Sequence, residues 1–292
     1  MEDTTRRSLQ ELGTVYQLNP QFRDIFVEGR EDARFLTFHL EALGVQHLSV
    51  RAVGDAVRLS DEEVVAFGCD AGERGRVIAL SLAAEGWGVA PQTVTCIVDS
   101  DFDALSGPCL AGGGLLRTDF AAMEVYSLEE RPLRKFLGCV RKDRVVPSEL
   151  LEALTGLWRH LFVLRYVLHR DHARALNDGF CRRIKLSGES PQIDLRNEAR
   201  IVLERCGDGV LAAVEKSCME QLARIPQEGL QGIRGHDIAP VLTWYLRLRG
   251  EFKSTEVVES LLRQSIESSD VMSKPLFVAL AARYGSQQQL IP

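Results

Sequence analysis

Three aspartates follow an apolar run near the middle of the 292-residue chain. The run 93–98 is typical of a buried strand, and Asp99, Asp101 and Asp103 come directly after it at intervals of two residues. Residues i and i+2 of an extended strand point to the same face, so Asp99 and Asp101 should leave the strand on one side. Carboxylates this close repel each other unless they share a cation, and hard oxygen ligands suit Mg²⁺ or Mn²⁺. A solvated acidic turn explains the three aspartates equally well, because Asp is a common turn residue.

A second acidic residue ends another predicted strand, and this favours the metal interpretation. The segment 23–29 reads as a short buried strand that closes with Glu28 and a glycine. A helix over 30–43 is predicted directly after it, because apolar residues recur there at helical spacing. Asp32 falls in the first turn of this helix, close to Glu28.

The order of the elements predicts an α/β fold with a mostly parallel sheet flanked by helices. Further strands are expected over 47–53, 93–98 and 115–117, and a helix over 76–85. After the last strand, Thr118 and Asp119 are expected to cap a helix that starts near Phe120 and carries Glu124. Parallel sheets bind ligands outside the carboxyl ends of their strands. Glu28, Asp99 and Asp119 all stand at such ends, so we expect them to converge.

Two loops border the expected site. The segment 70–75 could cradle a phosphate at a helix start, but a plain glycine turn is favoured because the full phosphate-loop spacing is absent. Residues 104–114 are rich in Gly and Ala and are expected to form a flexible loop over the acidic site. Upstream of both, Ser60 and Glu63 form a capping-box pattern that predicts a short helix.

The pattern changes to helices after about residue 144, which predicts a catalytic domain over 1–144 and an all-helical domain over 145–292. A helix opening at Pro147 carries a long leucine stripe that could mediate a homodimer or form internal core. Its other face is basic, and a second basic segment follows: Arg159, Arg165, His169, Arg170, His172 and Arg174, then Arg182 and Arg183. This basic face would suit a phosphate backbone. The alternatives are a solvated face or a contact with the acids of the first domain.

The helical half also holds the segment Gly235-His236-Asp237, which precedes a predicted helix. Asp237 can serve as the helix cap. His236 would then stand at the positive end of the helix, which disfavours its charged form. A neutral imidazole there could accept a proton or bind a metal, whereas the plainer interpretation is that His236 only packs or caps.

The overall composition is that of an ordinary globular protein, with 45% hydrophobic and 26% charged residues. The net charge of −6 argues against a protein coated in basic surface, although nucleic-acid binding needs only a local positive patch. Seven cysteines without a Cys-x-x-Cys pair predict reduced thiols and no zinc ribbon. Neither a signal peptide nor a membrane span is expected, so the predicted location is cytoplasmic.

The motifs taken together resemble the Toprim domain, which carries a glutamate after its first strand and Asp-x-Asp after a later one. They are most similar to one Toprim-like branch, the DUF4435 family. The matching residues are Val27, Glu28, Gly29 and Asp32; Val98, Asp99, Asp101, Phe102 and Asp103; Thr118, Asp119 and Glu124; and Gly235, His236 and Asp237. The resemblance covers the first 140 residues well and the helical half weakly.

This resemblance implies a function as well as a fold. Toprim proteins use the acids to hold Mg²⁺ and the glutamate as an acid or base in phosphodiester chemistry. A topoisomerase would need a separate domain with a nucleophilic tyrosine, and a primase of this type would carry a zinc ribbon, so a nuclease remains. DUF4435 proteins resemble effectors of bacterial anti-phage defence that are paired with an ABC-type ATPase, and some such effectors are implicated in cleaving transfer RNA. The chain has no Gly-x-x-x-x-Gly-Lys motif, so an ATPase would be a separate partner.

Two hypotheses follow. The first is a nuclease that uses Mg²⁺ or Mn²⁺ and acts on RNA such as tRNA in preference to DNA. Its expected residues are Glu28, Asp32 and His236 for catalysis; Glu28, Asp99, Asp101, Asp103 and Glu124 for the metal; and Arg165, Arg170, Arg182 and Arg183 for the substrate. The second is a binding or regulatory module with a degenerate site that acts through a partner ATPase. The acidic net charge and the scarcity of lysine around the acids favour the second.

Overall fold

The computed structural model describes residues 6–45, 47–107, 113–141, 145–176, 178–188 and 190–285. The chain divides into two compact units, each described here by itself. The first comprises Met1–Ser100, Pro108–Asp119 and Glu267–Pro292, and the second comprises Asp101–Gly107 and Phe120–Ile266. This division differs from the predicted boundary at 144, because the chain enters the second unit earlier and its C-terminal segment returns to the first. Part of the expected loop 104–114 lies outside the described residues.

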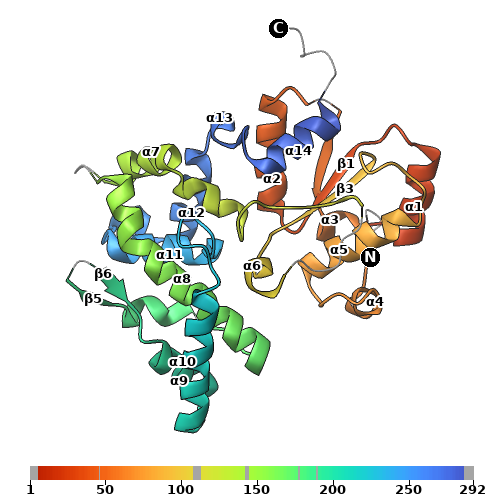
Figure 1. Ribbon diagram of the computed structural model, residues 1–292. Coiled ribbons are helices and arrows are strands. Elements are labelled where there is room, and N and C mark those ends of the chain that lie inside the picture. Colours follow the sequence, from red (N-terminus) through yellow and green to blue (C-terminus); the bar gives the residue numbers. More distant parts are fainter. Residues whose placement is uncertain are drawn as a thin grey trace. The chain divides into compact units, whose positions relative to one another are not determined.

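A four-stranded parallel sheet forms the centre of the first unit, in the order β2-β1-β3-β4 (Figure 1). The strands are β1 (Asp24–Val27), β2 (Ser49–Ala52), β3 (Val94–Val98) and β4 (Leu115–Arg117). In β1, Ile25 pairs with Val50 of β2 on one side and with Thr95 of β3 on the other. The prediction of a mostly parallel sheet flanked by helices is confirmed.

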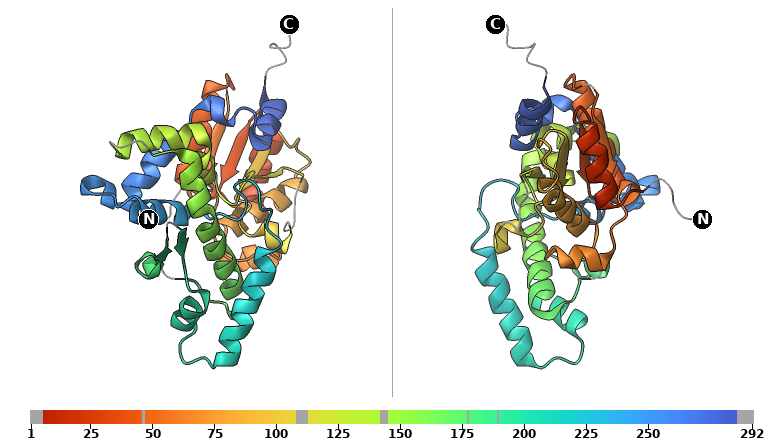
Figure 2. Two further views of the ribbon diagram at one scale, coloured as in Figure 1. Left: turned by 60° about the vertical axis from the view of Figure 1, so that its left-hand side comes forward. Right: turned by 90° about the vertical axis from the view of Figure 1, so that its right-hand side faces the viewer.

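Alternating side chains of these strands enter two different layers, as the pleat requires. Phe26, Cys96 and Val98 join the core formed with α1 (Leu9–Leu18) and α5 (Glu73–Glu85). The other face is covered by α2 (Arg30–Ala42) and α14 (Pro275–Tyr284), which lie side by side (Figures 1 and 2). There Thr95 receives hydrogen bonds from Arg283 Nη1 at 2.9 Å and from the Tyr284 hydroxyl at 2.5 Å. The C-terminal segment therefore completes the sheet's second layer, which the helical pattern alone did not predict.

Short helices complete the first unit: α3 (Val53–Ala56), α4 (Asp61–Ala66) and α13 (Ser268–Val271). The capping box before α4 is confirmed, because Ser60 N donates to Glu63 Oε2 at 2.8 Å and Glu63 N donates to Ser60 Oγ at 3.2 Å. The segment 70–75 leads into α5, which begins at Glu73, earlier than predicted. Gly72 has a φ of 123°, and a Cβ on Gly75 would collide with the Asp70 carbonyl. Both glycines are thus required by the backbone of the turn.

The second unit is built around α8 (Pro147–His172), whose leucine stripe lies in its core. Proline is tolerated at the first helical position, and the helix ends where Ala173 adopts a φ of 51°. The other elements are α6 (Asp103–Ser106), η1 (Met123–Leu128), α7 (Glu130–Val140), η2 (Asp178–Arg183), β5 (Lys185–Ser187), β6 (Ser190–Gln192), α9 (Leu195–Leu203), α10 (Asp208–Leu222), α11 (Gly235–Tyr245), η3 (Gly250–Lys253) and α12 (Thr255–Ser265). The antiparallel pair β5-β6 shows that the unit is not all-helical.

The helix predicted near Phe120 with a Thr118-Asp119 cap is wrong. A 3₁₀ helix, η1, begins instead at Met123. The reason is that both capping side chains have other partners in the first unit. The Thr118 hydroxyl accepts from Ser100 N at 2.9 Å, and Asp119 Oδ1 accepts from Leu276 N at 3.0 Å.

The described cysteines are free thiols, and two of them, Cys96 and Cys218, are buried. Cys109 lies outside the described residues. None of the described helices combines the length and the apolar character needed to cross a membrane.

Candidate functional site

The carboxyl edge of the sheet in the first unit brings two of the expected acidic residues together. Glu28 follows β1 and Asp99 follows β3, and these two strands are neighbours. Glu28 Oε1 accepts a hydrogen bond from the backbone N–H of Asp99 at 3.0 Å. Each residue is partly exposed. Two carboxylate-bearing residues from segments 71 positions apart therefore meet at one point of the sheet rim.

The N-terminal turns of two helices stabilise the contact between Glu28 and Asp99. Asp32, in the first turn of α2, accepts from the backbone N–H of Gly29 at 3.2 Å, which fixes the turn that follows Glu28. Arg74, in the first turn of α5, donates from Nη1 to the carbonyl oxygen of Asp99. Both helices run back along the sheet from the carboxyl edge, so their positive ends lie on the same side as the two acids.

Arg74 was missed by the sequence reasoning, although the loop that contains it was considered. The order of the helices and strands could have placed Arg74 at the carboxyl edge. A helix that precedes a parallel strand begins at the carboxyl edge of the sheet, because the crossover runs antiparallel to the strands. The first turn of α5 therefore has to lie near the end of β3, and Arg74 is in that turn.

Asp101 and Asp103 belong to the second unit, in which Asp103 begins α6. Asp101 adopts a φ of 39°, a left-handed conformation that Asp tolerates better than most residues, and its N–H donates to the Ala121 carbonyl at 3.0 Å. Between them, Phe102 packs against Phe162 of α8, with ring centroids 5.1 Å apart. The Asp-x-Asp-Phe-Asp motif thus starts in one compact unit and ends in the other.

Glu124 lies in a different cluster of ionisable side chains in the second unit. Its side chain is buried and forms an ion pair with Arg263 of α12. A Cβ on Gly235 would come within 2.9 Å of Glu124 Cδ, so this glycine permits α11 to approach the carboxylate. His236 is exposed beside it. Burial raises the pKa of Glu259, the charge of His236 opposes this rise, and the charge of Glu124 adds to it. Glu124 and His236 therefore share one neighbourhood, with Glu259 as a member that the sequence reasoning missed.

Two arginines of the predicted basic face, Arg159 and Arg165, are buried, whereas His169, Arg170 and Arg174 are exposed. Arg165 is buried and binds both carboxylate oxygens of Asp237, with Nε to Oδ2 at 2.9 Å and Nη2 to Oδ1 at 2.7 Å. Asp237 is therefore an ion-pair partner, and the prediction that it caps a helix is wrong, because α11 already begins at Gly235. Arg159 is also buried and donates to three backbone carbonyls of residues 227–231. Burial lowers the pKa of Arg159.

The other expected substrate-binding arginines differ in their surroundings. Arg183 binds the buried carboxylate of Glu198, with Nη2 to Oε2 at 2.6 Å. Arg170 pairs with its neighbour Asp171, and the hydrogen bond to that carboxylate raises the pKa of Arg170. Arg182 is exposed. The interpretation of this face as solvated thus fails for Arg159 and Arg165, whose partners are groups of their own unit.

The donor chemistry at the carboxyl edge fits a small divalent cation. Glu28 and Asp99 supply hard carboxylate oxygens, and Mg²⁺ is usually held by one or two carboxylates together with water and substrate phosphates. Among the described residues, no group of three or more His, Cys, Asp and Glu side chains is arranged to hold a metal ion. The contact on which a cation site could be built is the hydrogen bond between the Glu28 carboxylate and the backbone N–H of Asp99.

Comparison with protein-family models gives no match, and comparison with curated proteins gives none either.

Proposed function

We propose that the chain is a Mg²⁺-dependent nuclease with a Toprim-like catalytic unit. The observation that supports this is the hydrogen bond that joins Glu28 to the backbone of Asp99 at the carboxyl edge of a parallel sheet. This edge is where such sheets bind their ligands, and the two residues come from the ends of neighbouring strands. An acidic pair at this position matches the glutamate and the first aspartate of the motifs that resemble Toprim proteins.

In this proposal Asp99 holds the cation, and the resemblance to the Asp-x-Asp motif of Toprim proteins assigns Asp101 to the same role. A bound Mg²⁺ would supply charge stabilisation for the phosphodiester and activate a water molecule. Glu28 would accept a proton from the attacking water while the bond between phosphorus and the leaving oxygen breaks. Arg74 acts as a positioning residue through the Asp99 carbonyl. Glu124 takes no direct part, because its carboxylate is engaged by Arg263.

The substrate and the partners in this proposal follow from the resemblance to DUF4435 proteins. RNA, with tRNA as the first candidate, is favoured over DNA, and a separate ABC-type ATPase would regulate the nuclease during anti-phage defence. Arg182 is the expected substrate-binding arginine that remains best suited to an external phosphate, because it is exposed. A homodimer through the α8 stripe is not proposed, since the leucines of that stripe are buried within the second unit.

The decisive variant is Glu28→Gln. A glutamine keeps an oxygen that can accept from Asp99 N, so the local fold should persist while the carboxylate is lost. We expect a decrease of at least about 100-fold in Mg²⁺-dependent cleavage of a tRNA pool, the size typical of a lost general base. Asp101→Ala should abolish cleavage as well. The matched control is Glu31→Gln, which neutralises an exposed acid in the first turn of α2 and should cleave like the wild type.

If Glu28→Gln and Asp101→Ala both cleaved like the wild type, the assignment would be wrong. The second candidate is a catalytically degenerate module that acts through a partner ATPase, and the internal pairing of Arg165 and Arg183 favours it. Titration of the wild-type chain with Mn²⁺, followed by the paramagnetic signal of the free ion, separates the two. Binding that Glu28→Gln weakens supports the nuclease, and no binding together with no cleavage supports the degenerate module.

A further inference from the structure

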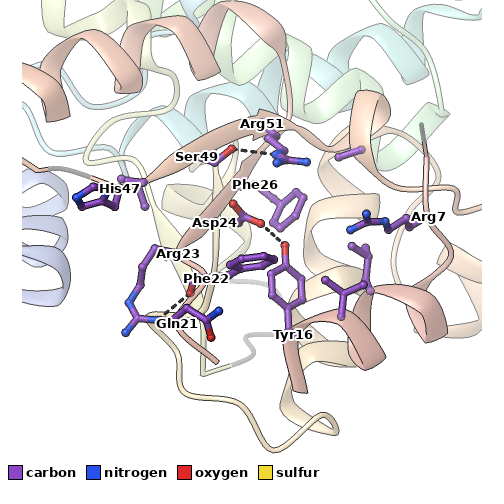
Figure 3. Close-up of a pocket in the computed structure, with 14 residues that line it drawn as sticks. Arg7, Tyr16, Gln21, Phe22, Arg23, Asp24, Phe26, His47, Ser49 and Arg51 are labelled. Carbon is purple, nitrogen blue, oxygen red and sulfur yellow. Dashed lines mark hydrogen bonds between the residues drawn. The ribbon is translucent and has the colours of Figure 1, made fainter. Parts of the chain in front are cut away.

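A cavity of about 670 Å³ opens at the amino edge of the same sheet, away from Glu28 and Asp99. It lies where β1 and β2 begin, at Asp24 and Ser49, and α1 forms its opposite wall (Figure 3). Its volume falls in the range of sites for small organic ligands. Its lining extends along β1 as far as Phe26, and neither Glu28 nor Asp99 is among the residues that line it.

Three arginines give the cavity a positive lining, although the chain as a whole carries a net charge of −6. Arg7, Arg23 and Arg51 reach it from three different segments. Among the described lining residues the one acid is Asp24, and its carboxylate accepts from the buried Tyr16 hydroxyl at 2.6 Å. The wall is therefore cationic, with its single carboxylate already bound by a neutral donor.

The arginines are held in position by uncharged groups. Arg51 Nε donates to Ser49 Oγ at 2.9 Å, and Arg23 Nη1 donates to two backbone carbonyls at 2.8 Å each. The backbone of Arg7 is fixed by a bridge to the segment at Val57, with Arg7 N donating to the Ala56 carbonyl at 3.0 Å. The hydrogen bonds of Arg23 and Arg51 orient these two side chains without neutralising their charge, which leaves that charge available to an anion. The bridge places only the backbone of Arg7, whose charge also acts on Glu11.

The cavity also offers a flat apolar surface. Phe22 stands in it beside Tyr16 and Asp24 (Figure 3), and 40% of its area is exposed to solvent. Phe26 lines the cavity from β1. An exposed phenylalanine among arginines suits a ligand that joins a planar ring to an anionic group, because the ring can stack while guanidinium groups bind the anion.

We propose that this cavity binds a nucleoside phosphate, with the phosphate held by Arg7 and Arg51 and the base stacked on Phe22. The ligand chemistry is the same for a free mononucleotide and for the phosphorylated end of an RNA strand. The site is distinct from the proposed catalytic edge and does not depend on the nuclease activity.

Calorimetric titration of the full chain with AMP, adenosine, inorganic phosphate and a 5′-phosphorylated trinucleotide tests the proposal. We expect AMP to bind at least about tenfold more tightly than adenosine or phosphate alone, since its phosphate can bind the arginines while its base stacks on Phe22. Tighter binding of the trinucleotide than of AMP identifies a strand end as the ligand, and the reverse identifies a free nucleotide. The proposal is overturned if neither AMP nor the trinucleotide binds, or if AMP and inorganic phosphate bind equally well.

Variants locate the binding. Arg51→Ala should weaken AMP binding at least about tenfold, the equivalent of one charged hydrogen-bond contact, and Phe22→Ala should weaken AMP but not phosphate. The matched control is Arg34→Ala, which removes an exposed arginine of the same unit that does not line the cavity. All three positions are exposed, so folding should survive, and circular dichroism checks this. Equal AMP affinity of Arg51→Ala and Arg34→Ala would refute the assignment.

Discussion

The ion pair between Arg165 and Asp237 provides the sharpest test of the second unit. The two side chains are 8% and 2% exposed, and they form two hydrogen bonds of 2.9 and 2.7 Å. Arg165 Nη1 also donates to the Leu176 carbonyl at 2.9 Å. Replacing Arg165 by Met would leave the Asp237 carboxylate charged, buried and without these donors. Removal of one partner of a buried pair costs about 3–5 kcal/mol of unfolding free energy.

Urea unfolding followed by tryptophan fluorescence measures this cost. Trp158 is a suitable reporter because its indole N–H donates to the Asp237 carbonyl at 3.2 Å, so it senses the same neighbourhood. With a denaturant slope of about 2 kcal/mol per molar urea, the midpoint of Arg165→Met should fall by about 2 M. The double variant with Asp237→Leu should recover most of the loss, since an apolar pair can replace a buried ion pair.

An exposed ion pair of the same unit supplies the control. Arg134 and Glu130 are 65% and 69% exposed, so Arg134→Ala should change the unfolding free energy by no more than about 0.5 kcal/mol. A loss below about 1 kcal/mol for Arg165→Met would refute the structural role. It would also revive the expectation that Arg165 binds a substrate phosphate, and in that case RNA affinity should fall while stability does not.

Two further predictions concern the first unit. Burial lowers the pKa of His39 to about 4, so the folded state disfavours the charged imidazole. The unfolding free energy should therefore be highest above about pH 6.5 and should fall by up to about 3 kcal/mol as the pH drops from 6.5 to 4. Urea midpoints across this range should show the fall in the wild type and not in His39→Gln. Gly75→Ala would make a Cβ collide with the Asp70 carbonyl oxygen as well as approach Val64 Cγ1 to 2.9 Å, so it should cost about 3 kcal/mol or more. Gly138→Ala, with open space at that position of α7, should gain about 0.5–1 kcal/mol. Thermal melts that rank the two variants alike would contradict the close approach at Gly75.

The sheet was predictable because β1 and β3 are short buried runs, and β2 shows apolar residues in alternation. The four predicted strands all form, and their parallel pairing followed from the alternation with helices. The second layer could not be foreseen in the same way. Helical periodicity shows that 275–284 is a helix with a buried face, but it does not say which surface buries that face. Its contacts with Thr95, about 180 residues earlier, are a property of the tertiary fold.

The candidate site was likewise predictable in part: strand order predicts which acids meet, but helical spacing does not predict the partners of the arginines. The meeting of Glu28 and Asp99 follows from strand order, since neighbouring parallel strands end at one rim. The fate of the arginines does not follow from helical spacing. Arg159 lies on α8 opposite the leucine stripe, a position typical of a solvated side chain, yet the backbone carbonyls of residues 227–231 pack against it. Sequence spacing identifies a charged face, and only the packing of another segment determines whether solvent reaches it.

Charge at the carboxyl edge makes the cation the deciding feature of the proposed function. A phosphate that approaches this edge meets the acids Glu28 and Asp99, while Arg74 and Arg117, the last residue of β4, supply positive charge. At about 4 Å each such unit-charge interaction is worth from about 1 kcal/mol in water to about 4 kcal/mol near a protein surface, so the two carboxylates offset the attraction of the two arginines. A bound divalent ion turns this balance in favour of the phosphate. Substrate binding and hydrolysis at this edge therefore require the same ion, and a chain that binds no divalent cation here cannot be a nuclease of this type.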